Sequence, residues 1–164
     1  MAESSRNIFE HYEIIEKIGE GGAAHVYRCV HIATGKMWAA KVTKLRSQSG
    51  LLDELLKEAE LMRQLRHPRI IRMEDVFVTD GNLFLVMEIL EGGDLLDRIL
   101  EKREAALALA TESAFRSGGV VDEMDVVEGY SEDDAREVML QLLDAMVYIH
   151  RRNIAHRDLK PENI

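Results

Sequence analysis

The fold of this chain is decided by the stretch His156-Arg157-Asp158-Leu159-Lys160-Pro161-Glu162-Asn163, near the end of its 164 residues. The stretch follows a long helical pattern and combines an acid, a base, an amide and a proline. Proline fixes one backbone angle and removes a hydrogen-bond donor, so we expect a rigid loop here. A rigid loop suits a chemical site, because reacting groups have to be held in fixed positions.

This stretch resembles the catalytic loop of eukaryotic protein kinases, which reads H-R-D-x-K-P-x-N in the serine/threonine type. The resemblance implies transfer of the γ-phosphate of ATP, with Mg²⁺ as the metal. Asp158 would be the base that accepts the proton of the substrate hydroxyl, and Lys160 would neutralise charge on the γ-phosphate. Asn163 would hold one magnesium ion. Lysine at position 160 implies serine or threonine substrates rather than tyrosine.

The other polar residues of the loop have supporting roles in this family. Arg157 would support the loop backbone and receive a phosphate from the activation loop, and His156 would be structural. Glu162, together with Asp94 further upstream, would attract basic residues of a peptide substrate. The resemblance therefore implies protein substrates in which basic residues flank the target serine or threonine.

The composition excludes several other classes of protein. The hydrophobic fraction of 46% is typical of a globular chain, and the net charge of −9 without a basic block argues against nucleic-acid binding. No apolar run approaches the roughly 20 residues of a membrane span, and the N-terminus lacks the apolar core of a signal peptide. The single cysteine, Cys29, allows no internal disulfide. We expect a soluble, cytoplasmic, monomeric protein.

The residues upstream of the loop predict strands and one helix. Together with the resemblance, they imply an α+β fold of the two-lobe kinase type. The expected small lobe spans residues 12–88, after an N-terminal extension at 1–11, and contains a five-stranded antiparallel sheet. Runs of β-forming residues predict strands at 12–19, 23–31, 37–43, 73–78 and 83–88. A helix is expected at 53–64, and Asp80-Gly81 predicts the turn of the last hairpin.

A glycine-rich turn, Gly19-Glu20-Gly21-Gly22-Ala23-Ala24, lies between the first two strands. Glycines let backbone amides approach an anion, although a plain glycine-rich hairpin would have the same composition. The turn resembles the kinase pattern G-x-G-x-x-G-x-V, except that Ala24 replaces the third glycine, which implies a slightly stiffer loop that still binds ATP. Val26 would lie against the adenine. The nucleotide contacts implied in this part are Ile18, Gly19, Glu20, Gly21, Gly22, Ala23, Ala24, Val26 and Ala39.

Lys41 is the expected phosphate-binding residue of the third strand. Ala39-Ala40-Lys41-Val42 resembles the kinase strand V-A-I-K, whose lysine grips the α- and β-phosphates. Period-two alternation places Lys41 on the same face as Met37, Ala39 and Thr43. A solvated lysine at a sheet edge is the alternative interpretation.

Glu58 is the expected partner of Lys41. An apolar stripe recurs at helical spacing, and Glu58 falls in its middle by helical geometry. A carboxylate in a buried face needs a cation, and Lys41 is available. Glu58 also stands nine residues before His67-Pro68, the interval found in the kinase family. The stripe consists of Leu51, Leu55, Met62 and Leu65.

Residues 89–94 resemble the kinase hinge, because their paired glycines suggest a flexible connector. Met87 would be the gatekeeper behind the adenine, and backbone groups of Glu88 and Leu90 would bond the adenine edge. Asp94 can cap a short helix at 95–102 and would also reach the ribose.

Residues 95–164 would begin the large lobe, with the catalytic loop at 156–163. Residues 103–129 are expected to form an insertion that is part helix-prone and part mobile, either a tolerated surface loop or a docking or regulatory segment. Ser131 and Asp134 have capping-box spacing and open a further helix, which would end near Asn153 in a left-handed cap. The apolar face expected for this helix consists of Val138, Met139, Leu142, Ala145, Met146 and Ile149.

The 164 residues contain no D-F-G segment, which in kinases supplies the principal magnesium ligand. We therefore expect a fragment of a longer serine/threonine kinase, incomplete at its C-terminus and inactive by itself. The sequence most resembles the calcium/calmodulin-dependent group, so calmodulin or another regulator could act outside these residues. Two alternatives stay open: a nucleotide-binding pseudokinase or scaffold, and a module that only binds partners.

Overall fold

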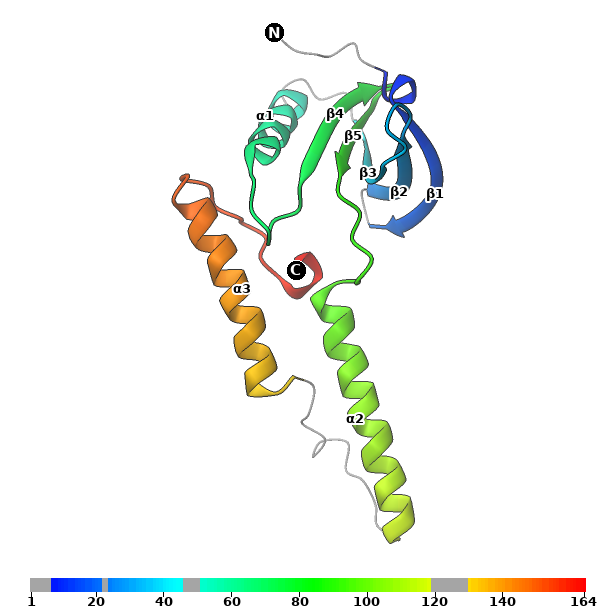
Figure 1. Cartoon of the computed structure of the whole chain (residues 1–164), viewed down its shortest axis with the longest axis vertical. Coiled ribbons are helices and arrows are strands. Elements are labelled where there is room, and N and C mark those ends of the chain that lie inside the picture. The colour runs from blue at the N-terminus through cyan, green and yellow to red at the C-terminus, as the bar shows by residue number, and fades with distance from the viewer. Residues whose placement is uncertain (1–6, 22–23, 46–50, 119–129) are drawn as a thin grey trace. The chain divides into compact units, whose positions relative to one another are not determined.

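The computed structural model describes residues 7–21, 24–45, 51–118 and 130–164. The chain forms two compact units, Met1–Leu90 and Glu91–Ile164. The first unit holds a five-stranded antiparallel sheet and a helix, and the second holds two long helices and a short 3₁₀ turn (Figure 1). The α+β class predicted from the sequence is therefore confirmed.

The five strands of the first unit agree with the predicted strands to within one residue at each end. The hydrogen-bonded order is β1-β2-β3-β5-β4, and all neighbours are antiparallel. Asp80 and Gly81, at the predicted turn between the last two strands, have φ angles of 50° and 72°, as a tight hairpin requires. The strands are β1 (Tyr12–Glu20), β2 (Ala24–His31), β3 (Met37–Lys44), β4 (Met73–Thr79) and β5 (Asn82–Met87).

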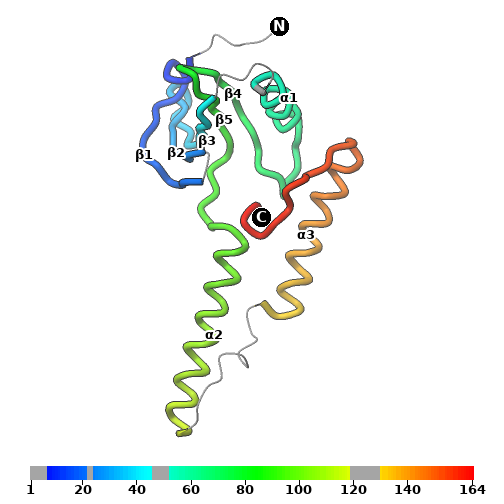
Figure 2. The backbone as a smooth tube through the Cα atoms, turned by 180° about the vertical axis from the view of Figure 1, so that it is seen from behind, coloured from blue at the N-terminus to red at the C-terminus, as the bar shows by residue number. Residues whose placement is uncertain are grey.

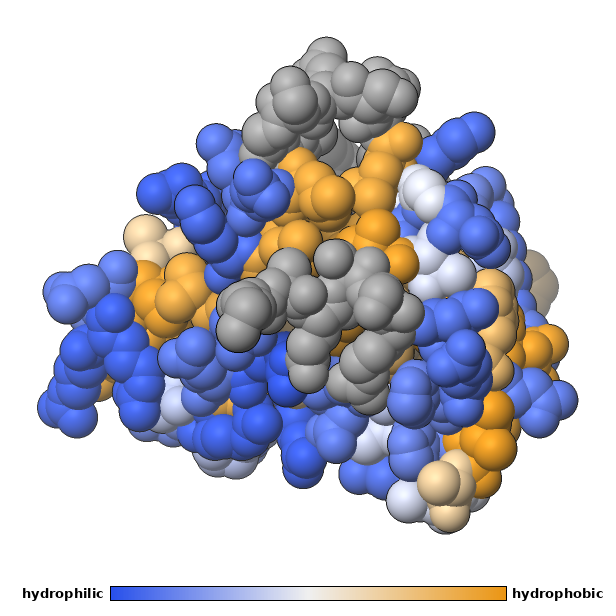
Figure 3. All heavy atoms as spheres, turned by 90° about the horizontal axis from the view of Figure 1, so that it is seen from above, coloured by the Kyte–Doolittle hydropathy of each residue, from blue (hydrophilic) through white to orange (hydrophobic). Residues whose placement is uncertain are grey.

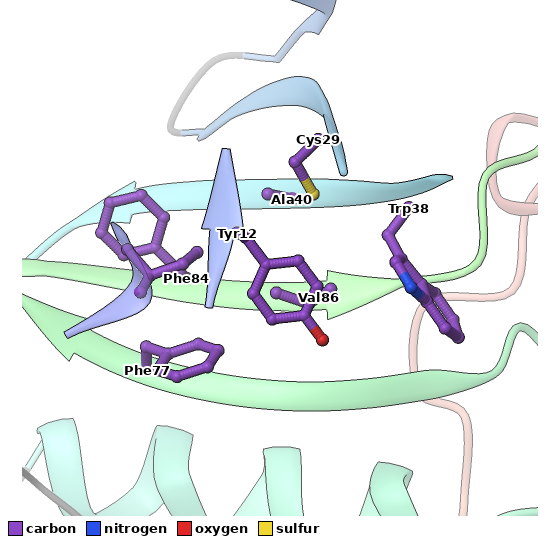
Figure 4. Packing of buried hydrophobic residues seen from close by; sticks show 8 residues of the cluster. Tyr12, Cys29, Trp38, Ala40, Phe77, Phe84 and Val86 are labelled. Carbon is purple, nitrogen blue, oxygen red and sulfur yellow. The ribbon is translucent and has the colours of Figure 1, made fainter. Parts of the chain in front are cut away.

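One face of this sheet forms the core. The 3₁₀ helix η1 (Ile8–Glu10) adds the fully buried Ile8 to it. Tyr12 packs edge-on against Phe77 at 5.8 Å, and its hydroxyl donates to Oδ2 of Asp75 at 2.7 Å. Figure 4 shows Tyr12, Phe77 and other core side chains gathered over the strands. The members of the core are Ile8, Tyr12, Cys29, Trp38, Ala40, Phe77, Phe84 and Val86.

Helix α1 (Leu51–Gln64) packs beside β4, as the two backbone views show (Figures 1 and 2). Ala59 is buried in this contact region, and Leu55 and Met62 are half-buried. Other apolar side chains reach the surface, including Phe9 of η1 and Leu61 of α1, which are 52% and 51% exposed. Figure 3 shows an apolar area bordered by polar side chains on the upper face.

In the second unit, helix α2 (Leu95–Ser117) is much longer than predicted. Asp94 caps its start, and its carboxylate accepts from the amide of Asp97 at 2.9 Å, as expected. The predicted end at Lys102 is wrong, because the alanine-rich residues after it favour continuation of the helix. Gly118, with φ of 68°, ends it. Residues 103–117 of the expected insertion are thus helical, and residues 119–129 lie outside the described residues.

Helix α3 (Glu132–His150) begins and ends as the sequence predicts. The hydroxyl of Ser131 accepts from the amide of Asp134 at 3.1 Å, and Asn153, with φ of 57°, forms the left-handed cap. Ala145 and Ile149 are the buried members of the expected apolar face, whereas Met139 is 50% exposed and does not belong to it.

The two helices of the second unit are linked through Lys102. Its Nζ atom lies 2.6 Å from Oδ2 of Asp134 and 4.3 Å from the centre of the Tyr130 ring. The amide of Leu95, at the start of α2, donates to the carbonyl of Ile164 at 2.8 Å, directly after the 3₁₀ turn η2 (Pro161–Asn163). No helix within the described ranges has both the length and the apolar character of a membrane span.

Candidate functional site

One face of the sheet carries several of the residues expected to contact ATP. Strand pairing sets Val26 opposite Lys41, and Ala39 opposite Met87. Directly opposed residues point to the same face, as do residues two apart in one strand. Val26, Ala39, Lys41 and Met87 therefore share one face, and the core residue Ala40 points to the other. The alternation predicted for the third strand is confirmed.

The turn between β1 and β2 brings a glycine against this face. Gly19 pairs with Val26, and a Cβ atom on Gly19 would lie 3.4 Å from the Cβ atom of Val26. The amide of Gly21 donates to the carbonyl of Ala24 at 2.8 Å, which closes the hairpin. A side chain at position 19 would therefore lie directly against Val26. The expected contacts Gly22 and Ala23 lie outside the described residues.

The carboxylate of Glu20 is held by neighbours on the sheet. Nζ of Lys17 donates to it at 2.6 Å, and Nδ1 of His25 lies 3.8 Å away. The hydrogen bond and charge of Lys17 hold the pKa of Glu20 below its usual range. Glu20 can thus offer its backbone to a ligand, while its side chain is already engaged. Ile18, the preceding expected contact, is 39% exposed.

Glu58 lies exposed on α1, so the prediction that it interrupts a buried stripe is wrong. The buried residue is Ala59, and successive residues of a helix are turned by about 100° from each other. The predicted stripe included Leu65, which follows the last helical residue, Gln64, and so does not share the helical geometry. Lys41 is also exposed, and among the described residues no ion pair joins it to Glu58.

The segment after β5 begins with Glu88, which is hydrogen-bonded to Arg72, the residue before β4. The amide of Glu88 donates to the carbonyl of Arg72 at 2.9 Å, and the amide of Arg72 donates to Oε1 of Glu88 at 2.7 Å. Leu90, the second expected adenine contact, is 65% exposed. Asp94, expected to reach the ribose, uses one carboxylate oxygen to cap α2.

The loop after α3 brings together the predicted catalytic residues Asp158 and Lys160 and the predicted magnesium ligand Asn163. Nδ2 of Asn163 donates to the carbonyl of Asp158 at 2.7 Å and to its Oδ2 atom at 2.9 Å. Nζ of Lys160 lies 3.3 Å from the same Oδ2 atom. These contacts hold the pKa of Asp158 below its usual range. The hydrogen bond from Asn163 has the largest effect, and that from Lys160 the second largest. Asp158 is therefore an ionised, exposed carboxylate at neutral pH.

The loop backbone is strained beside this carboxylate. Arg157 has φ of 67°, a left-handed conformation that a non-glycine residue seldom adopts. Such strain persists only where the surroundings enforce it, and it concentrates at functional sites. His156 and Glu162 are exposed, and His156 contributes only a small charge effect on Asp158.

The geometry also suits an oxygen-preferring cation at Asn163. Both contacts of its Nδ2 atom are acceptors, so the amide nitrogen has to face Asp158 and Oδ1 stays available as a ligand. No cluster of three or more histidine, cysteine, aspartate or glutamate residues that could hold a metal occurs in the described part of the chain.

Arg72 contacts Glu88 at the expected adenine-binding segment, and the sequence did not indicate this contact. Counting from the Thr79–Asn82 pair of the hairpin would place it opposite Ile89, but a bulge between Met73 and Asp75 shifts the register so that it meets Glu88. A bulge leaves little trace in a single sequence, so this contact could be found only from the structure.

Comparison with known proteins gives one family. Residues 12–164 match the family model described as "Protein kinase domain". The chain is 33% identical over its whole length to serine/threonine-protein kinase RAD53 of Saccharomyces cerevisiae, and covers 17% of that protein. It is 34% identical, over 93% of its length, to mouse calcium/calmodulin-dependent protein kinase type IV, of which it covers 27%. It is equally similar, over 93% of its length, to rice CBL-interacting protein kinase 4, with 29% of that protein covered.

Proposed function

The chain belongs to the protein kinase domain family, and on that premise we propose that the protein carrying it transfers the γ-phosphate of ATP to serine or threonine hydroxyls of protein substrates. The observation that carries the proposal is the group formed by Asp158, Lys160 and Asn163. Phosphoryl transfer needs a proton acceptor, a positive charge and a metal-binding oxygen around the reacting hydroxyl. Asp158, Lys160 and Asn163 can supply these three groups.

In the proposed reaction Asp158 accepts the proton of the substrate hydroxyl as the bond from that oxygen to the γ-phosphorus forms. The bond from the γ-phosphorus to the bridging oxygen breaks, and ADP leaves. Lys160 lies close enough to Asp158 to balance negative charge beside it. Mg²⁺, when bound through Oδ1 of Asn163, would neutralise phosphate charge.

ATP is proposed to bind on the sheet face of Val26, Ala39, Lys41 and Met87. The adenine would lie between the apolar side chains, and backbone groups of Glu88 and Leu90 would bond its edge. Amides of the glycine-rich turn and the ammonium of Lys41 would meet the phosphates.

Glu58 remains the proposed partner of Lys41, in a second arrangement of α1. Both side chains are exposed, so neither loses a buried contact when the helix turns. We propose that the pair forms when ATP and its metal are bound and that it fixes Lys41 for catalysis.

The proposed substrates are proteins with basic residues near the target serine or threonine, because Asp94 and Glu162 offer carboxylates in the second unit. Several similar proteins are named as serine/threonine or calcium/calmodulin-dependent kinases, which supports this class and calmodulin as a regulator. The buried single cysteine, Cys29, fits a reducing, cytoplasmic compartment.

A nucleotide-binding scaffold is the second candidate. The absence of a Lys41–Glu58 pair in the described residues, and alanine in place of the third glycine at position 24, both favour it. A scaffold would bind ATP without turning it over, so activity separates the two candidates.

The test is Asp158→Asn in the protein that carries this chain, assayed by transfer of labelled γ-phosphate to serine and threonine peptides. We expect a loss of roughly 10²- to 10⁴-fold in rate, with ATP binding retained, because only the proton acceptor is removed. Equal rates for variant and wild type would reject the proposal, and ATP binding without any transfer by the wild type would favour the scaffold. The 164-residue polypeptide by itself is expected to transfer no phosphate, since it contains no D-F-G aspartate.

A further inference from the structure

Arg72 and Glu88 form an incomplete hydrogen-bonded pair where β4 and β5 meet the connector to the second unit. In an antiparallel ladder, two residues of such a pair exchange both backbone hydrogen bonds. Here the amide of Glu88 donates to the carbonyl of Arg72 at 2.9 Å, as expected. The return bond differs, because the amide of Arg72 donates at 2.7 Å to the carboxylate of Glu88 and not to its backbone carbonyl.

The carboxylate of Glu88 thus replaces its own carbonyl in the ladder. No hydrogen bond from the described residues reaches the backbone carbonyl of Glu88. A backbone acceptor left out of a ladder still needs a donor, from water or from a ligand. This carbonyl directly follows Met87, whose side chain lies on the sheet face shared with Ala39 and Lys41.

The side chain of Arg72 has partners other than Glu88. Its guanidinium bonds the carboxylate of Glu74 at 2.7 Å and lies 5.9 Å from the centre of the buried Trp38 ring. The guanidinium therefore has partners of its own, and among the described residues Arg72 meets the Glu88 carboxylate only through its backbone amide.

We propose that Glu88 is a positioning residue that selects adenine nucleotides, an inference that rests on the proposed ATP-binding function. The carboxylate of Glu88 accepts the hydrogen bond of the Arg72 amide. The backbone carbonyl of Glu88 therefore stays available to accept a hydrogen bond from the nucleotide. A carbonyl can only accept, so its partner has to donate, and the 6-amino group of adenine is such a donor. Guanine carries a carbonyl oxygen at the same position and would be repelled.

The experiment compares ATP with a purine nucleoside triphosphate that lacks the 6-amino group, in the protein that carries this chain. For Glu88→Ala we expect the amide of Arg72 to turn to the backbone carbonyl, which weakens ATP binding and raises its KM roughly 3- to 10-fold with little change in kcat. The affinity for the analogue should stay unchanged, because it never uses the carbonyl. Unchanged analogue binding also shows that the variant is folded.

Two further variants separate a positioning role of Glu88 from a merely structural one. Glu88→Gln keeps an acceptor oxygen for Arg72, so it should retain the preference for ATP over the analogue. Glu74→Ala, the matched control, removes the neighbouring carboxylate that bonds only the Arg72 side chain, and should also retain that preference.

Equal weakening of both nucleotides by Glu88→Ala would show a merely structural role and overturn the inference. The inference would also fail if Glu88→Gln behaved like Glu88→Ala. In both cases the wild type would still bind ATP, so the proposed function would stand. A wild type that bound neither nucleotide would overturn the proposed function and this inference together.

Discussion

Asn163 holds Asp158 at two points with a single nitrogen atom. Nδ2 of Asn163 bonds the backbone carbonyl of Asp158 at 2.7 Å and one oxygen of its carboxylate at 2.9 Å. A side chain fixed at its backbone and at its tip has little freedom, although every residue from 156 to 163 is exposed. The proposed base is therefore oriented by its own loop, and a buried pocket is not needed for this.

Replacing Asn163 by alanine should cost activity and change its pH dependence. The hydrogen bond from Asn163 is the largest cause of the lowered pKa of Asp158, so its loss lets that pKa rise. Because the reaction needs the ionised carboxylate, the acid limb of the pH–rate profile should move to higher pH, with the rate reduced by roughly 100-fold or more at its maximum. Rates of the variant measured from pH 4 to 8 provide the check.

Lys160→Ala serves as the comparison for this variant, because Lys160 is the second contributor to the lowered pKa. It should move the acid limb in the same direction but less far. An acid limb that stayed in place in Asn163→Ala would show that the bond seen between Asn163 and Asp158 does not set the ionisation of the base.

Glu58→Ala should impair activity without affecting stability. Glu58 is exposed and has no ion pair with Lys41 among the described residues, so its removal should change the free energy of unfolding by less than about 0.5 kcal/mol. If the pair with Lys41 forms during catalysis, the rate should fall roughly 10- to 100-fold. Urea unfolding and phosphate-transfer rates measure the two effects, and Glu54→Ala, also exposed on α1, is the control. Full activity of Glu58→Ala would remove Glu58 from the proposed mechanism.

The order of strands and helices could be read from the sequence because local signals agree with the fold. Asp80-Gly81 occupies a turn with two positive φ angles, and Ser131 and Asp94 cap the helices that they precede. These signals depend on a few neighbouring residues, so they survive without knowledge of the tertiary structure. The exposed loop of Asp158 and Asn163 was recognisable for the same reason, since its residues are contiguous.

Features that depend on distant residues were missed. The direction that Glu58 faces depends on which side of α1 meets β4, and the predicted stripe included Leu65, which lies beyond the last helical residue. The bond between Arg72 and Glu88 depends on a bulge in β4, which changes the register by one residue. The helix-prone residues after Lys102 continue α2 without a break, and whether such residues extend a helix or form a separate one depends on contacts that the sequence does not show.

Tyr12→Phe should destabilise the sheet unit by about 1 kcal/mol, because it removes the bond from the buried hydroxyl to Asp75. Urea unfolding at pH 7 measures this loss. Tyr27→Phe is the matched control: Tyr27 is half-buried, and its hydroxyl makes no hydrogen bond within the described ranges, so the substitution should be nearly neutral.

The difference in the free energy of unfolding between the wild type and Tyr12→Phe should become smaller at high pH. Burial, and then the bond to Asp75, raise the pKa of Tyr12 far above its ordinary value of 10.0. The contribution of Tyr12 to stability is therefore complete below about pH 10. As the pH rises further, the unfolded wild type ionises first, and the advantage over the variant should shrink. An advantage that grew above pH 10 would contradict the buried, neutral hydroxyl.

Gly92 and Gly93 should respond differently to alanine, although they are neighbours in the connector. Gly93 has φ of 72°, which costs an L-residue about 1 to 2 kcal/mol, whereas Gly92 has no positive φ, and a Cβ atom added to it would meet no atom within 4 Å. Gly93 precedes the capping residue Asp94, so its left-handed backbone sets the chain direction that lets Asp94 cap α2. Gly93→Ala should therefore lower the free energy of unfolding by about 1 kcal/mol or more, and Gly92→Ala should leave it nearly unchanged, both measured by urea unfolding. Equal costs at the two positions would mean that crowding or chain entropy, and not the left-handed turn at Gly93, governs this connector.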